Sequence, residues 1–217
     1  MSGGRSKLGG QALRLLHLRH FHLEVLGDGN VGTLYDFVQY LLLLLLFDRG
    51  SRFVASRLWW RERIISVTSS LPDADIAAQR LLQNQVDIGN AIKPVYGDEA
   101  GEQLTFLLND HILITADLMA AANAGDNTKF EDANKRWYNN ADQIAAFLNS
   151  ANPDHWPLAD MQSMMNSHLD LTLEEATARL NADWSGDVAA YDKVHDEILD
   201  MAGMLTQGIV AQFPDTF

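Results

Sequence analysis

From Leu58 to the C-terminus, apolar residues recur every three or four positions, the spacing that places them on one face of an α-helix. All five prolines fall between these periodic stretches or after the last one, as expected for a residue that cannot continue a helix. No stretch shows the period-two alternation of a strand. The predicted helices span residues 58–70, 74–92, 98–124, 128–150, 158–183 and 187–213. The predicted fold class is therefore all-α, a six-helix bundle of three antiparallel helix hairpins.

Two of the predicted helices carry the same polar motif. Residues 109–115 and residues 166–172 both read Asn-x-His-x-x-x-Thr, and each motif lies on a helix face that is otherwise apolar. The helices that follow the two motifs can also be aligned with each other, so the repeated unit is predicted to be a helix hairpin. The motif histidines, His111 and His168, are therefore expected to point into the core at similar depths, given the constant rise of a helix.

The chain from about Trp59 to its end resembles a group of small bacterial helical proteins. Two motifs of that group, Asp-His followed by Thr and a later His-x-x-x-Thr, recur here at Asp110, His111, Thr115, His168 and Thr172. Two further features of the group differ in this chain. Trp59-Trp60-Arg61 stands in place of Trp-Thr-Arg, and Ser56 stands in place of a histidine. The resemblance implies a helical-bundle fold and no established activity.

A buried histidine layer containing His111 and His168 is one candidate site, either for a metal ion or for a small ligand. Helical bundles build such sites from facing side chains, and imidazole suits divalent transition metals such as Zn, Cu, Fe or Ni. The possible contributors are Asp87, Asn90, Asn140, Thr115, Thr172, Met201 and His195. Of these, His195 lies too close to the start of its helix to share the layer. The paired Glu-x-x-His motifs of di-iron bundles are absent from the sequence.

The competing hypothesis is a non-catalytic interaction or assembly protein in which both histidines are structural. Buried polar groups are normally hydrogen-bonded, and each imidazole could pair with Thr115, with Thr172 or with the other imidazole. Such pairs can also fix the register of similar helices. The sequence contains no nucleophile elbow, P-loop or His-Glu-x-x-His motif, so whether the protein is an enzyme stays open.

Charge narrows the range of partners. The formal net charge of -13 argues against nucleic acid and anionic membrane surfaces as partners, because both bind basic patches. A homo-oligomer remains compatible with the sequence. The absence of cysteine excludes disulfides and thiolate zinc sites. The apolar run over residues 34–47 contains Asp36 and is shorter than the ~20 residues that a bilayer requires, so no transmembrane helix is predicted and a cytoplasmic location is expected.

Residues 1–57 differ from the rest of the chain. They carry seven basic and four acidic residues, in contrast to the acidic remainder. We therefore divide the chain into an atypical N-terminal segment, 1–57, and a helical bundle domain, 58–217. The segment is either an appendage that packs on the bundle or the product of a shifted reading frame or an upstream start. Its Gly27-x-Gly29-x-x-Gly32 spacing is interpreted as incidental, because a dinucleotide-binding turn requires a parallel sheet.

Overall fold

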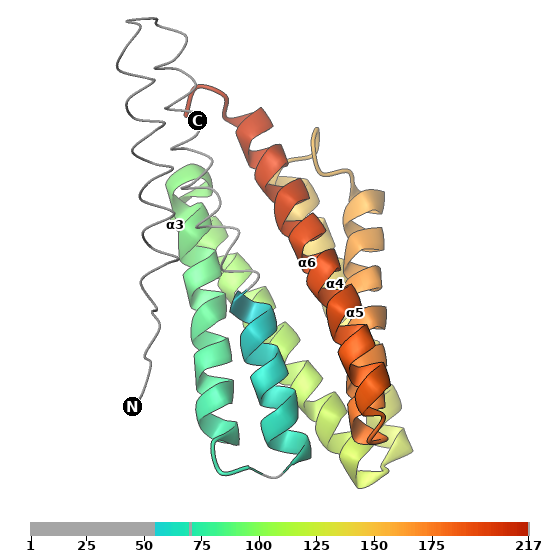
Figure 1. Cartoon of the computed structure of the whole chain (residues 1–217). Helices are drawn as coiled ribbons and strands as arrows, with labels where there is room; N and C mark the ends of the chain where they lie inside the picture. Colours follow the sequence, from blue (N-terminus) through green and yellow to red (C-terminus); the bar gives the residue numbers. More distant parts are fainter. Residues whose placement is uncertain (1–54, 70, 217) are drawn as a thin grey trace, which may run out of the picture. The chain divides into compact units, whose positions relative to one another are not determined.

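The computed structural model describes residues 55–69 and 71–216, and these residues belong to one unit of the chain, Leu46–Phe217. A helix over residues 55–68 is followed by α3 (Ala74–Ala124), α4 (Asn127–Ala151), α5 (Leu158–Leu180) and α6 (Trp184–Gln212) (Figure 1). No strand occurs within these described ranges. The all-α prediction is confirmed for them. The predictions for residues 1–54, including the glycine turn, lie outside the described residues.

The described part of the chain has five helices where six were predicted, because residues 74–92 and 98–124 belong to the single element α3. Gly97 interrupts the helical geometry of α3 with φ 86° and ψ 169°, a conformation open essentially to glycine alone. Figure 1 shows that the chain reverses within α3, so that the two halves of this element lie side by side. A Cβ atom placed on Gly89 would lie 2.4 Å from the carbonyl oxygen of Gly101. Pro94, predicted to end a helix, lies inside α3 instead.

Aspartate side chains cap the N-termini of α4 and α6. Asp126 accepts a hydrogen bond from the backbone N–H of Lys129 at 3.1 Å, and Asp183 accepts one from Gly186 at 2.9 Å. Such caps satisfy backbone donors that have no partner within the helix. Ser185 and Gly186, which fall between the predicted helices 158–183 and 187–213, lie in the first turn of α6 instead.

Two apolar clusters hold the described helices together. The larger joins α3, α4, α5 and α6, and its most buried side chains include Leu118, Trp137, Met161, Leu169 and Val194. The smaller places Trp60 and Ile64 of helix 55–68 against α3 and α5, with Leu81, Met119 and Ala176. Each large apolar side chain that is fully buried contributes about 1.5–3 kcal/mol to folding. In the larger cluster, α4 lies between α3 and α5, and α5 packs against α6.

Among the described helices, α3 is long and apolar enough to cross a membrane by length and composition. Its best window has a mean hydropathy of 1.3, and 44% of that window is buried inside the structure. Since the core helix of a soluble protein passes the same test, the finding is weak evidence. The expected cytoplasmic location stays a prediction.

Candidate functional site

A cavity of about 100 Å³ lies between helix 55–68 and the four labelled helices. Most of its wall is apolar, with side chains such as Ile88, Leu104, Ile144, Met165, Ile198 and Leu205. Both motif histidines line it, together with Thr115, Thr172 and Met201 from the predicted contributors. The histidines and threonines of the two motifs therefore lie at one apolar cavity, whereas the motif asparagines, Asn109 and Asn166, do not line it.

His111 is held by hydrogen bonds at both ring nitrogens. The indole Nε1–H of Trp137 donates to His111 Nε2 at 3.0 Å, and His111 Nδ1 lies 2.7 Å from Asn140 Oδ1. Because an indole N–H can only donate, Nε2 must accept and Nδ1 must carry the proton. The amide of Asn140 fits this assignment, since its Nδ2 donates to the carbonyl oxygen of Leu107 at 3.1 Å. The imidazole is therefore a neutral Nδ1–H tautomer.

Burial keeps His111 neutral. Removal from water is the largest influence, and together with the nearby His168 it lowers the pKa of His111 to about 3. The hydrogen bond to Asn140 opposes both effects and is the weaker influence. His111 therefore offers the cavity an uncharged ring at any ordinary pH.

His168 lies close to His111 but is more exposed to solvent. The two ring centroids are 6.4 Å apart, with 31° between the ring planes. His168 Nδ1 lies 2.9 Å from Glu197 Oε2 of α6, and both side chains are partly exposed. The structure thus brings the two predicted histidines together, with different partners for each.

The two motif threonines bond to neither imidazole. Thr115 Oγ1 donates to the backbone carbonyl of His111 at 2.6 Å, a bond within the helix. Thr172 is only 4% exposed, and its hydroxyl has no hydrogen-bond partner in the described part of the protein. An unpaired buried hydroxyl is costly, so a group that could bond to it inside the cavity would be stabilised.

Three of the other predicted contributors lie away from the cavity. His195 stacks on Tyr191 with ring centroids 6.0 Å apart and does not line the cavity wall. Asp87 accepts a hydrogen bond from Gln83 at 3.2 Å, and Asn90 is exposed. Asn140 acts on the site through its bond to His111.

The metal hypothesis gains no support from this geometry. Residues 55–69 and 71–216 contain no group of three or more His, Cys, Asp or Glu side chains that could hold a metal ion. A metal ion at His111 would have to displace the bond from Trp137 or the bond to Asn140. Metal binding therefore stays a prediction, while the hydrogen bonds of His111 match the structural interpretation of that residue.

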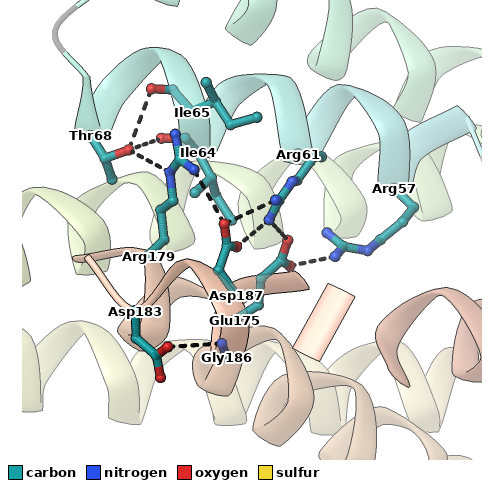
Figure 2. A network of polar contacts seen from close by, with 10 residues as sticks. All are labelled: Arg57, Arg61, Ile64, Ile65, Thr68, Glu175, Arg179, Asp183, Gly186 and Asp187. Carbon is teal, nitrogen blue, oxygen red and sulfur yellow. Dashed lines mark hydrogen bonds and ion pairs between the residues drawn. The ribbon is translucent and has the colours of Figure 1, made fainter. Parts of the chain in front are cut away.

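Sequence reasoning missed a buried ion network beside the cavity (Figure 2). Helix 55–68 contributes Arg57 and Arg61, α5 contributes Glu175 and Arg179, and α6 contributes Asp187. The two carboxylates are at most 1% exposed. One signal in the sequence could have revealed it, because Glu175 follows Thr172 by three residues and so shares the inward face of its helix.

Arg61 binds both carboxylates of the network. Its Nη1 lies 2.7 Å from Glu175 Oε1 and also contacts Asp187, while its Nη2 donates to Asp187 Oδ2 at 2.9 Å. Arg179 adds a bond of 3.2 Å to Asp187 Oδ2. Hydrogen bonds and the charges of the two carboxylates outweigh burial and raise the pKa of Arg61 above its usual value, although burial is the largest single influence and acts to lower it. The network is thus charged and closely coupled.

Ser56 also lines the cavity that holds both histidines. Its hydroxyl accepts a hydrogen bond from Gln85 Nε2 at 3.1 Å. The histidine that the resemblance places at this position would therefore lie at the same cavity.

No protein-family model matches the chain, and comparison with curated proteins and with solved structures finds no match.

Proposed function

We propose that this protein binds a small, mainly apolar ligand in the cavity beside His111 and His168. One observation carries the proposal: the apolar wall of the cavity includes polar groups that are buried and unpaired in the described structure, Thr172 Oγ1 and Trp60 Nε1. Ligand sites typically combine an apolar lining with a few polar groups that orient the ligand. An apolar cavity of about 150 Å³ can bind benzene, so this cavity of about 100 Å³ suits a ligand of roughly four to seven non-hydrogen atoms, a range that includes toluene.

The fold supports this function because all five described helices contribute to the wall of the cavity. We propose that the bundle consists of three hairpins: helix 55–68 with the first half of α3, the second half of α3 with α4, and α5 with α6. The reversal at Gly97 supports the division of α3. In this arrangement each hairpin contributes to the cavity wall, as Trp60, Trp137 and Met165 illustrate.

A change in stability on adding a probe ligand tests the proposal. If toluene binds in the cavity of the folded state, it should raise the free energy of unfolding by about RT ln(1 + [L]/Kd), measured by urea denaturation of the full chain. The Thr172→Leu variant fills the cavity and should lose this response. Thr177→Leu, on the exposed face of the same helix, is the matched control and should keep it. Equal stabilisation of all three proteins, or of none, contradicts the proposal.

A second candidate function, a helical interaction or assembly protein, is favoured by a separate surface feature. Phe106 and Leu113 of α3 are 66% and 54% exposed, and their spacing of seven residues places both on one outer face. Exposed apolar patches often mark protein interfaces. Sedimentation velocity over a range of concentrations tests this function: Phe106→Asp should abolish any self-association, whereas a sedimentation coefficient that stays at the value of a 24.2 kDa monomer excludes a homo-oligomer.

A further inference from the structure

We infer that the ligand of this cavity is a small carboxylic acid whose carboxylate is bound by Arg57. This inference rests on the proposed function and names the chemical class of the ligand. It depends on three properties of the cavity: one buried cation with free donors, a surplus of positive charge beside it, and further unpaired donors among the residues of the wall.

Arg57 is a buried cation that lines the cavity. It is 2% exposed, and it is the one permanently charged residue among the described residues of the cavity wall. Its Nη2 lies 2.5 Å from Glu175 Oε2, without the angle of a hydrogen bond. Its Nε and Nη1 are buried and have no hydrogen-bond partner in the described structure. A guanidinium group presents its N–H donors as a fork that matches the two oxygens of a carboxylate.

The ion network leaves Arg57 short of negative charge. Three guanidinium groups, those of Arg57, Arg61 and Arg179, share the two carboxylates of Glu175 and Asp187, which leaves one positive charge in excess. Arg61 already holds both carboxylates through hydrogen bonds. Since a buried charge is costly unless it is paired, an anion next to Arg57 would balance the cluster.

The other unpaired groups at the cavity favour an acceptor. Trp60 follows Arg57 by three residues on the same helix face, and its buried indole N–H has no partner in the described part of the chain. Thr172 supplies an unpaired hydroxyl. An ionised carboxylate only accepts hydrogen bonds, so it complements these donors, whereas a cation or an amine does not. The apolar remainder of the wall suits a short hydrocarbon chain.

The closing experiment compares two probes of nearly the same shape, butyrate and butyramide. Isothermal titration calorimetry of the full chain at pH 7, in a buffer free of chloride and of other carboxylates, measures both dissociation constants. Butyrate should bind at least tenfold more tightly than butyramide. In Arg57→Gln this preference should disappear, with butyramide binding unchanged. Arg136→Gln, which removes a cation from the surface of α4, should keep the preference.

A second variant keeps the test decisive if Arg57→Gln fails to fold. Arg57→Lys retains the charge but loses the fork of N–H donors. Its preference for butyrate over butyramide should therefore be smaller than that of the wild type but should not vanish. Equal binding of butyrate and butyramide overturns the assignment, as does a butyrate preference that neither variant alters. Chloride that binds as tightly as butyrate also overturns it, in favour of a simple anion site.

Toluene distinguishes the two proposals. If toluene binds without any butyrate preference, only the carboxylate assignment fails. If no probe binds, the proposed function fails as well.

Discussion

The indole N–H of Trp137 donates to Nε2 of His111 across 3.0 Å in the core. Together with the bond from His111 Nδ1 to Asn140, this contact fixes both the orientation and the protonation state of the imidazole. His111 is therefore a rigid, neutral part of the cavity wall. A ligand would meet its ring as a surface, and the chemistry of recognition would lie with the unpaired groups elsewhere in the wall.

The tautomer of His111 can be observed directly. Long-range ¹H–¹⁵N correlation spectra at pH 7 should show the proton of His111 on Nδ1 and none on Nε2. The Trp137→Phe variant removes the donor to Nε2 and should lower the free energy of unfolding by about 1–3 kcal/mol, because a buried acceptor is left unpaired. Trp184→Phe, at a site that is 57% exposed, is the control and should cost less. A proton on Nε2 in the wild type contradicts the assignment.

The low pKa of His111 predicts a specific dependence of stability on pH. The unfolded chain binds a proton at this residue near pH 6.5, whereas the folded protein does so only at about pH 3. Between these values the unfolded state binds more protons, so stability falls as the pH is lowered, by up to about 1.4 kcal/mol per pH unit from this group. Urea denaturation of the wild type and of His111→Gln between pH 4 and 8 should show a shallower slope for the variant. Parallel profiles contradict the prediction.

The reversal of α3 depends on the backbone conformation of Gly97. An alanine at φ 86° and ψ 169° is strained, so Gly97→Ala should destabilise the protein by about 1–3 kcal/mol. Gly203→Ala is the matched control, because Gly203 lies within α6 and no heavy atom lies within 4 Å of the added Cβ. That substitution should stabilise the protein by roughly 0.5–1 kcal/mol. Effects of the same sign in chemical denaturation would contradict this account of the turn.

The neighbouring residues Glu174 and Glu175 allow a test of the ion network. Glu175→Gln keeps the shape of the side chain but leaves Arg57 and Arg61 short of an anion, so it should cost about 3–5 kcal/mol. Glu174→Gln removes an exposed ion pair with Lys193, and its cost should stay below about 1 kcal/mol. Equal losses in the two variants, measured by urea denaturation at low and high salt, would mean that the buried network contributes no more than a surface pair.

The sequence predicted the all-α fold of the described residues and the proximity of the two histidines for sound physical reasons. Apolar periodicity reports which face of a helix is buried, and it identified α4 and α5 to within a few residues. His111 and His168 occupy the same place in a repeated motif, so an inward orientation at equal depth followed from helix geometry. Asn140 emerged as a candidate by the same reasoning about depth.

Other features depend on contacts that no local pattern contains. Pro94 was the strongest helix-ending signal in this part of the sequence. The reversal of α3 nevertheless occurs at Gly97, where the backbone conformation itself requires glycine. The bond from Trp137 to His111 depends on how two aromatic rings tilt in the core. The pairing of the buried residues Arg57 and Glu175 joins positions more than one hundred residues apart, so no local pattern in the sequence contains this contact.

The most direct measurement of the central claim, ligand binding in the histidine cavity, is a toluene titration followed by the indole N–H signals in ¹H–¹⁵N NMR spectra. Trp60 and Trp137 line the cavity, whereas Trp184 is exposed and does not line it. If toluene binds there, the Trp60 and Trp137 signals should shift in a saturable way, the Trp184 signal should not move, and the shifts should be lost in Thr172→Leu. Signals that stay unmoved at toluene saturation, or that all move alike in both proteins, would contradict the claim.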